Sequence, residues 1–402
     1  MREMKSSGLP WVDNIPEGWK IARGKEILTL LSRPVEPTDG VITCFRDGEV
    51  TLRSKRRELG FTFSTQETGY QGIEPGDLVI HGMDGFAGSI GISDSRGKAT
   101  PVLNVMDSNQ NKKYLMYYFR AIAKAGYFES VATGIRVRTC DTNWNKISVT
   151  PCLIPPIEEQ FRIASFLDSR IAKIDDAIAR YKALSDKLDE YRKAIITKSV
   201  TEGVRGTRTM KDSNVDIIGD IPASWNMMRL KFLCSITTGN KDTKDADNNG
   251  KYPLYVRSPK VENCNDYSFE GESILMAGDG AGAGRIFHHA FGKYAVHQRV
   301  YILFKITNID SSYLFYYLSN KFCDEMDRGS AQSTVPSVRL PMLKDFQIPI
   351  PPQIEQKEIV AYLDKKCSEI DSSKEKIAAV VKKLEDYKKS LIFNAVTGKI
   401  EC

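Results

Sequence analysis

The most regular pattern of apolar residues lies in two segments, one near the middle of the chain and one near its end. In the first, the apolar positions recur every 3.5 residues on average, the period of a coiled-coil seam: Ile174, Ile178, Tyr181, Leu184, Leu188, Tyr191 and Ile195. The second segment repeats these offsets with one departure, a lysine, which we interpret as an edge where the seam opens: Ile370, Lys374, Ile377, Val380, Leu384, Tyr387 and Leu391. We predict two long helices, each with one seam and each paired with the other.

These segments belong to an internal repeat. Residues 154–201 and 350–397 align without a gap at an offset of 196, and 18 of the 48 positions are identical. A shorter echo precedes each copy, because Ile-Pro-x-x-Trp ends at Trp19 and again at Trp225. Repeats decide the architecture of a chain. We therefore expect a divergent segment and a repeated helical segment, followed by a second copy of each.

Local signals mark the ends of the predicted helices. Two prolines open each repeated segment, at Pro155-Pro156 and Pro351-Pro352, and proline suits the first turn of a helix. Gly203 and Gly398 stand where the helices should stop. A helix packed only on its own domain remains an alternative, although sustained 3.5 periodicity in both copies favours pairing.

The divergent segments, about 20–153 and 226–349, contain short β-like runs, glycine-rich turns and one tyrosine-rich helix each. We expect a mixed α/β domain in each, and core packing for the tyrosines. The fold class is therefore α+β: two such domains in pseudo-two-fold repeat, separated by two long helices forming an antiparallel coiled coil. The expected boundaries are 1–154, 155–204, 205–350 and 351–402.

Composition narrows the functional classes. Hydrophobic residues make up 41% and charged residues 27% of the 402 residues, as in ordinary globular proteins, and the net charge of +6 permits a polyanionic partner. No apolar run is long enough to span a membrane and no secretory signal is visible, so a cytoplasmic location is expected. The eight cysteines and four histidines show no metal-ligand spacing. We expect scattered reduced thiols and no metal site.

Catalytic motifs are missing as well. The run GDGAGAG at 278–284 fits neither a dinucleotide nor a phosphate loop, and a turn is the better interpretation. Asp77, Asp84 and Asp279 are solitary acids beside glycines and are interpreted as turn residues. We therefore expect a chain without catalysis of its own.

Basic and amide side chains in the divergent segments are the candidates for nucleic-acid contact. Arginine and glutamine can pair with guanine and adenine edges in the major groove, whereas lysine more often contacts phosphate. The candidates are Arg53, Lys55, Arg56, Arg57, Arg136, Arg138, Arg257, Lys260, Gln332, Ser333 and Arg339.

Taken together, the chain resembles the specificity subunit of type I restriction–modification systems. The resemblance rests on IPEGW and IPASW, on PPIEEQ and PPQIEQ, and on the helix endings YRKAIITKSVTEG and YKKSLIFNAVTGK. Their order and doubling cover essentially the whole chain. The combination is specific, although each piece alone would be a weak signal.

The resemblance implies that each divergent segment is a target recognition domain that reads one half of a bipartite sequence in double-stranded DNA. The helices would set the distance between the half-sites and dock two methylation subunits, and restriction subunits would complete the enzyme. S-adenosylmethionine, ATP and Mg²⁺ would belong to those partners, with no cofactor and no membrane contact for this chain. The resemblance assigns no catalytic residue to this chain. It also cannot assign the base-reading residues.

The physical logic agrees with this resemblance. Antiparallel pairing of two tandem halves would relate their domains by a pseudo-two-fold axis, like a dimer on two half-sites, and the differing domains would read different sequences. About forty helical residues give on the order of 60 Å, more than one DNA turn. An alternative function, from another class of protein, is that of a coiled-coil scaffold that joins protein partners without reading DNA. An enzyme that carries its own recognition domain is a further alternative, but it lacks the motifs that its chemistry needs.

Overall fold

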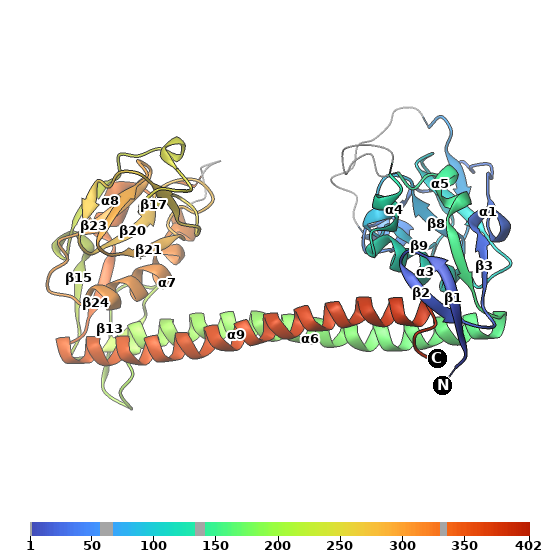
Figure 1. Cartoon of the computed structure of the whole chain (residues 1–402). Coiled ribbons are helices and arrows are strands. Elements are labelled where there is room, and N and C mark those ends of the chain that lie inside the picture. The colour runs from blue at the N-terminus through green and yellow to red at the C-terminus, as the bar shows by residue number, and fades with distance from the viewer. Residues whose placement is uncertain (1, 57–66, 133–140, 330–335) are drawn as a thin grey trace. The chain divides into compact units, whose positions relative to one another are not determined.

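The computed structural model describes residues 2–56, 67–132, 141–329 and 336–402 (Figure 1). Contacts divide the chain into two compact units. Unit 1 combines Met1–Tyr181 with Ala379–Cys402, and unit 2 is the continuous segment Lys182–Ala378. Both long helices contribute to both units. None of the described helices is long and apolar enough to cross a membrane.

Unit 1 contains a four-stranded sheet in the order β4-β11-β8-β9 and a helix, α3, that packs on β8 and β9. A second group of strands lies beside it: β10 pairs with β7, β5 pairs with β6, and a parallel bridge from Val41 to Lys98 joins the two pairs. The elements are β1 (Met4–Leu9), β2 (Val12–Pro16), β3 (Lys20–Arg23), α1 (Gly24–Ile27), β4 (Thr29–Leu30), β5 (Ile42–Cys44), β6 (Val50–Leu52), α2 (Arg53–Arg56), β7 (Gln71–Ile73), β8 (Leu78–His81), η1 (Gly85–Ala87), β9 (Ile90–Ile92), β10 (Gly97–Ala99), β11 (Leu103–Asp107), α3 (Lys112–Lys124), α4 (Tyr127–Ser130), α5 (Trp144–Val149) and β12 (Pro151–Ile154).

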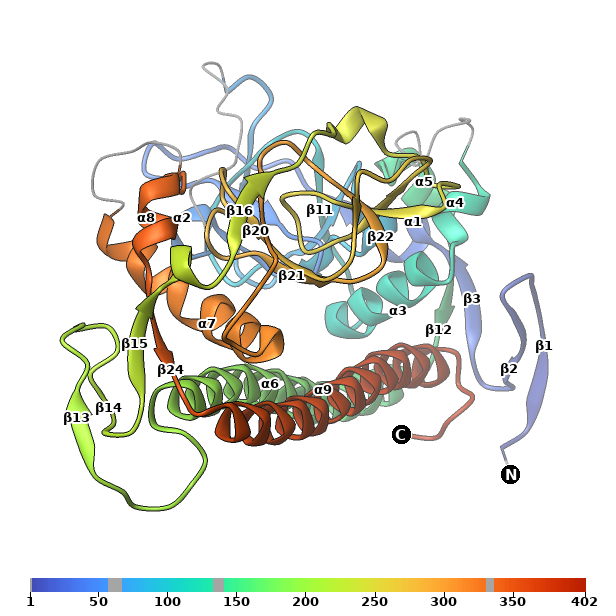
Figure 2. The same cartoon turned by 90° about the vertical axis from the view of Figure 1, so that its left-hand side faces the viewer.

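Unit 2 repeats this topology. Its first sheet has the order β16-β23-β20-β21, its second has the order β18-β17-β22-β19 with β17 parallel to β22, and α7 packs on β20 and β21 (Figure 2). The elements are β13 (Met210–Asp212), β14 (Asp220–Pro222), β15 (Asn226–Arg229), η3 (Leu230–Phe232), β16 (Ser235–Thr238), η4 (Thr243–Asp245), β17 (Tyr252–Tyr255), β18 (Glu262–Cys264), β19 (Phe269–Glu270), β20 (Ser273–Ala277), β21 (Phe287–Ala290), β22 (Lys293–Val296), β23 (Val300–Phe304), α7 (Ser311–Gly329), α8 (Leu340–Asp345) and β24 (Gln347–Ile350).

The repeated segments form α6 (Ile157–Glu202) and α9 (Gln353–Val396). Each begins directly after its proline pair. Gly203 and Gly398 follow the helix ends with positive φ values of 80° and 73°, a conformation that glycine adopts without steric cost. The α+β class and the pairing of the two long helices are therefore confirmed.

The helices run antiparallel within each unit. In unit 2, Asp189 and Arg192 of α6 pair with Lys374 and Asp371 of α9, so numbers rise on one helix as they fall on the other. In unit 1, the Lys388 ammonium of α9 lies 2.7 Å from the Asp175 carboxylate of α6. Lys374, the departure from the apolar seam, thus forms an ion pair with the facing helix.

Candidate nucleic-acid interface

The repeated motifs attach the rest of each unit to the long helices. In unit 1, the buried Glu159 carboxylate near the start of α6 accepts hydrogen bonds from the Trp19 indole at 3.1 Å and from Arg2. Glu355 of α9 does the same in unit 2, with equivalent donors, the Trp225 indole at 3.1 Å and Arg208. A buried carboxylate is stable only when such donors satisfy it. The identical residues of the repeat therefore serve attachment.

The tyrosine-rich helices complete this attachment. In unit 1, the Tyr114 hydroxyl lies 2.8 Å from the Leu153 carbonyl oxygen and 3.3 Å from that of Val396. In unit 2, the Tyr313 hydroxyl lies 2.9 Å from the Pro349 carbonyl oxygen and 3.1 Å from that of Val200. Both tyrosines are fully buried. Their expected core packing comes with hydrogen bonds to the neighbouring strand and to the end of a long helix.

The predicted seam residues differ in exposure. Ile174, Ile178, Ile370 and Leu391 are buried, and Leu188, Ile195, Ile377, Val380 and Leu384 are half-buried. Four others are exposed, with between about a third and about a half of their maximal surface accessible: Tyr181, Leu184, Tyr191 and Tyr387. The exposed members lie on faces of α6 and α9 that their own unit does not cover.

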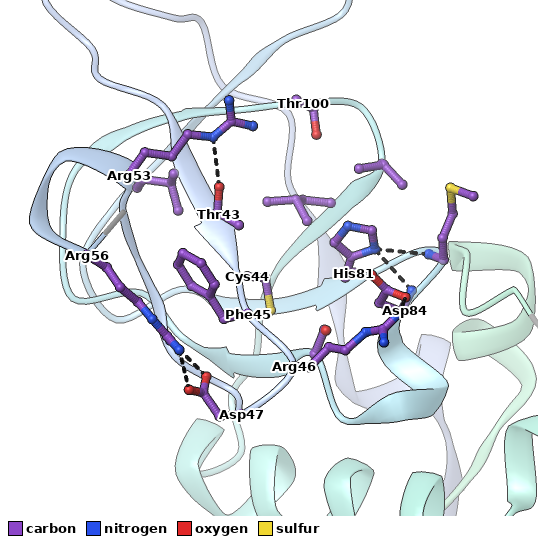
Figure 3. Close-up of a pocket in the computed structure, with 15 residues that line it drawn as sticks. Thr43, Cys44, Phe45, Arg46, Asp47, Arg53, Arg56, His81, Asp84 and Thr100 are labelled. Atoms are coloured by element: carbon purple, nitrogen blue, oxygen red, sulfur yellow. Dashed lines mark hydrogen bonds and ion pairs between the residues drawn. The ribbon is translucent and has the colours of Figure 1, made fainter. Parts of the chain in front are cut away.

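A hollow of about 1100 Å³ lies in unit 1 (Figure 3). It is bounded by β5 and the residues that follow it, by α2, by the end of β8 with the turn that follows, and by residues 100–103. Its lining residues are Ile42, Thr43, Cys44, Phe45, Arg46, Asp47, Arg53, Arg56, His81, Met83, Asp84, Ser89, Thr100, Val102 and Leu103. Three arginines and a histidine give its wall many hydrogen-bond donors.

Two of the candidate residues line this hollow. The Nε of Arg53 donates to the Thr43 hydroxyl at 3.0 Å, and burial lowers the pKa of this guanidinium. Arg56 lies 4.0 Å from the centre of the Phe45 ring and bonds both oxygens of Asp47. The Arg56 guanidinium therefore stacks on the Phe45 ring, and the Asp47 carboxylate balances its charge. These two contacts hold the guanidinium in one orientation.

The other candidates of unit 1 lie elsewhere. Lys55 contacts the Ser95 hydroxyl at 2.6 Å and the Asp94 carboxylate at 3.4 Å, and it does not line the hollow. Arg57, Arg136 and Arg138 lie outside the described residues, as do Gln332 and Ser333 of unit 2.

His81 fixes the turn at the floor of the hollow. Its Nδ1 accepts the backbone N–H groups of Met83 at 3.2 Å and Asp84 at 3.1 Å, so in the neutral ring the proton is on Nε2. Burial lowers the pKa of His81, which favours this neutral form. Ser89, directly before β9, accepts the backbone N–H group of His81 with its carbonyl oxygen, and its buried hydroxyl has no hydrogen-bond partner among the described residues.

The turn after β8 also holds an ion pair. Arg46 Nη2 donates to Asp84 Oδ1 at 2.8 Å, and Figure 3 shows the two side chains next to each other. Gly85 follows Asp84, and a Cβ there would lie 2.2 Å from the Thr142 hydroxyl oxygen. Only glycine fits this position, so the backbone that carries Asp84 is tightly constrained.

In unit 2, a carboxylate in the equivalent turn organises two arginines. Asp279 follows β20 and accepts from Arg257 at 2.7 Å and from Arg299 at 3.1 Å. It also forms a backbone bridge to Ser337. Of the predicted residues, Arg257 thus lies in this cluster. Lys260 lies three residues along, in a turn closed by Ser258, and Arg339 is an exposed residue directly before α8.

Sequence reasoning missed Arg46, His81 and Arg299, and it interpreted Asp84 and Asp279 only as turn residues. A faint signal exists: Phe45-Arg46 and Val256-Arg257 each follow a strand, and both acids stand in Asp-Gly pairs. The offsets are 211 for the arginines and 195 for the acids, so no gap-free alignment brings both together. Among the described residues, no group of three or more His, Cys, Asp or Glu side chains could hold a metal ion.

Comparison with known proteins gives a consistent result. The family model of the type I restriction modification DNA specificity domain matches residues 222–383. The chain is 26% identical over 182 residues to the EcoDI specificity subunit of Escherichia coli, an alignment that covers 45% of this chain and 40% of that subunit. It is 24% identical to the MjaVIII specificity subunit of Methanocaldococcus jannaschii, covering 82% of this chain and 80% of that subunit.

Two solved chains share the fold. A chain from a study of complex assembly and conformational transition of the type I R-M system gives a TM-score of 0.74 at 15% identity, covering 96% of this chain and 99% of that one. The HsdS subunit from Thermoanaerobacter tengcongensis gives 0.53 at 16% identity, covering 96% and 98%. Residues 222–383 thus match the type I restriction modification DNA specificity domain, and the chain is similar over most of its length to type I restriction enzyme specificity subunits.

Proposed function

We propose that this chain is the DNA-reading subunit of a type I restriction–modification complex and performs no catalysis itself. Each unit reads one half of an asymmetric bipartite site in double-stranded DNA. Two methylation subunits and the restriction subunits supply the chemistry, with S-adenosylmethionine, ATP and Mg²⁺ as their cofactors. The complex acts in the cytoplasm. In domain terms, residues 1–154 and 205–350 read DNA, and residues 155–204 and 351–402 form the spacer.

The observation that carries this proposal is the division of labour between identical and divergent residues. Identical residues attach each domain to a long helix: Trp19 bonds Glu159 in unit 1, and Trp225 bonds Glu355 in unit 2. The divergent residues line the hollow of unit 1 and surround Asp279 in unit 2. A protein that presents two different sets of donors on one repeated scaffold is suited to two different half-sites.

The chemistry of the divergent residues fits DNA. Arg53 and Arg257 offer guanidinium donors, which suit the acceptors of guanine edges and phosphate groups, and Arg56 adds a guanidinium whose terminal nitrogens already bond Asp47. The remaining candidates join the proposal as contacts to bases or phosphates: Lys55, Arg57, Arg136, Arg138, Lys260, Gln332, Ser333 and Arg339.

The long helices are proposed as the spacer and the docking surface. With 46 and 44 residues, α6 and α9 measure about 69 and 66 Å at 1.5 Å per residue. Exposed aromatic side chains on them, including Tyr191 and Tyr387, suit contact with the methylation subunits.

Replacing one recognition domain tests the reading proposal. Residues 20–153 are exchanged for those of a relative with a different specificity, the chain is coexpressed with its methylation subunits, and the methylated sequence is mapped across a genome. We expect one half-site to change and the other to persist. The reciprocal exchange of residues 226–349 is the matched control. A change in both half-sites would show shared reading, and a wild-type complex without sequence-specific binding would support the scaffold alternative.

Adding one heptad to both helices, with the seam kept in phase, tests the spacer proposal. The addition lengthens each helix by about 10 Å, or about three base pairs. We expect the same half-sites with a longer gap. A heptad added to α6 alone serves as the control, since it breaks the pairing and should abolish methylation. Methylation by the doubly extended chain at the original gap would contradict the spacer role.

A further inference from the structure

The two units place an arginine at the same point of their shared topology. Arg46 is the second residue after β5, and Arg257 is the second residue after β17. These strands correspond, because each pairs antiparallel with the next strand along the chain, β6 or β18. Each also makes parallel contact with the strand at β10 or β22. The two arginines therefore leave equivalent strands at equivalent positions.

An aspartate meets each arginine from a second equivalent element. Asp84 and Asp279 stand in the turns after β8 and β20, which are the third strands of their four-stranded sheets. The distances from the guanidinium nitrogen to the carboxylate oxygen are 2.8 Å and 2.7 Å. In both cases a glycine follows the aspartate, and Gly280 has a positive φ of 77°. The same arginine–aspartate pair therefore occurs in both units.

The rest of each neighbourhood differs. In unit 1, the His81 ring holds the turn by accepting the Asp84 backbone N–H group. In unit 2, Asp279 is instead held by a bridge to Ser337 and carries a second arginine, Arg299. The arginine–aspartate pair thus occurs in both units, although the residues that hold it differ. This indicates that the pair has the same role in both halves.

The charge of the pair indicates what it binds. A carboxylate beside a guanidinium cancels its charge and repels phosphate oxygens, so the pair is poorly suited to the DNA backbone. Guanine presents two neutral acceptors, N7 and O6, in the major groove. In both arginines, one terminal nitrogen donates a hydrogen bond to the aspartate carboxylate, which fixes the side chain and reduces the ordering cost of binding.

We propose that Arg46 and Arg257 each read a guanine in the major groove of their half-site, with Asp84 and Asp279 as positioning residues. This inference rests on the proposed function and names the base that each pair recognises. In unit 1, Arg46 and Asp84 line the hollow together with His81, so the guanine edge is presented to the mouth of that hollow.

The test uses the specificity chain assembled with its methylation subunits. The wild-type half-sites are mapped first, and each guanine is then replaced in turn by 7-deazaguanine, which lacks the N7 acceptor. Arg46→Ala should remove discrimination at one guanine of one half-site, by about tenfold to a hundredfold, and become insensitive to 7-deazaguanine there. Arg257→Ala should do the same in the other half-site only.

Variants of the aspartates separate positioning from folding. Asp84→Asn and Asp279→Asn should weaken discrimination at the same guanine while binding to unrelated duplex stays unchanged. Arg180→Ala on α6 and Arg229→Ala in unit 2 are matched controls, since both arginines form exposed ion pairs with aspartates away from these turns. They should leave every base preference intact.

Three results would overturn the inference while the proposed function stands. One is a half-site without a G·C pair. Another is an Arg46→Ala or Arg257→Ala complex that keeps its full base preferences. The third is a uniform loss of affinity at all positions of the site, together with a slope of log affinity against log salt concentration that is lower by about 0.9. Such a change marks the loss of a phosphate contact. A wild-type complex that reads no bipartite sequence would instead refute the proposed function.

Discussion

Unit 1 and unit 2 share the arrangement of their strands and tyrosine-rich helices. They differ in the solvent-facing turns of the divergent segments. Their four-stranded sheets have the same strand order, and their tyrosine helices pack on the same pair of strands. Even the hydrogen bonds of Trp19 and Trp225 have the same length. The difference begins at the second group of strands, which forms two pairs linked by a single parallel bridge in unit 1 and one four-stranded sheet in unit 2.

This comparison shows that the constant and variable parts meet inside each domain. Buried residues such as Trp19 and Trp225 are repeated because they bond equivalent glutamates of the repeated helices, Glu159 and Glu355. The residues around the hollow and around Asp279 have no such constraint, so they can differ. The residues that attach each domain to the long helices can therefore be mutated separately from those of the divergent turns.

The largest effect is expected from the attachment tryptophans. Trp19 and Trp225 are 1% and 0% exposed, and truncation to alanine should cost about 4 kcal/mol of local stability. Hydrogen exchange followed by mass spectrometry should show faster exchange in unit 1 for Trp19→Ala and in unit 2 for Trp225→Ala. Phe232→Ala, at an exposed position, is the control. Equal acceleration in both units after either change would mean that the units do not unfold separately.

A smaller loss should follow removal of the carboxylate that the tryptophans bond. Glu159→Ala leaves the buried Trp19 indole N–H without its acceptor, which should cost about 2 kcal/mol, and Glu355→Ala should cost the same in unit 2. Urea denaturation of each variant measures this. The neighbouring exposed Glu158→Ala is the matched control and should be nearly neutral. Unequal costs for the two glutamates would show that the attachments are not equivalent.

The helix ion pairs should contribute less. Asp175–Lys388 and Arg192–Asp371 are equivalent under the repeat, whereas Asp189–Lys374 has no counterpart. Lys374→Ala should lower the free energy of unfolding by about 0.5 kcal/mol, and the difference should fade in high salt. The exposed Lys376→Ala serves as control. A salt-independent loss would mean that the Lys374 side chain contributes by packing.

The smallest effect concerns pH. Because burial lowers the pKa of His81 below its ordinary value near 6.5, the folded state binds fewer protons than the unfolded state. Its contribution is present at neutral pH and is lost as the pH falls below 6.5. His81→Asn keeps an acceptor for the two backbone N–H groups and cannot be protonated in this range. It should therefore reduce the loss of unit 1 stability between pH 7 and pH 5.5.

Unit 2 provides the control for that measurement. Burial also lowers the pKa of His288 and His297, so unit 2 should lose stability over the same interval in both proteins. Hydrogen exchange at the two pH values separates the units. An unchanged pH dependence in unit 1 of the variant would exclude His81 as its source.

The sequence predicted the helices well because helical periodicity is a local signal and the repeat can be read by aligning the chain with itself. Prolines, glycines and the seam together located α6 and α9 to within one or two residues. Seam positions such as Leu184 and Tyr191 are exposed in the structure because a helix that pairs along one stripe leaves the flanks of that stripe in solvent. Periodicity alone does not define the width of the stripe.

The candidate site was less predictable. Side chains such as Arg46 and Asp84 are 38 positions apart and meet only because two strands of different sheets end side by side. Charge runs along the chain drew attention to Arg53–Arg57 instead, although Arg56 is already bonded to Asp47. Partners of this kind depend on strand order and turn geometry, which composition and spacing do not encode.

The division of the chain has a consequence for its synthesis. Unit 2 is one continuous stretch, but unit 1 needs residues 379–402, and Leu391, Ala395 and Val396 belong to its buried core. On the ribosome, the half that emerges first is thus the last to be completed. Until α9 arrives, the apolar face beside Tyr114 stays uncovered, and the nascent chain must avoid aggregation there while the later half already folds.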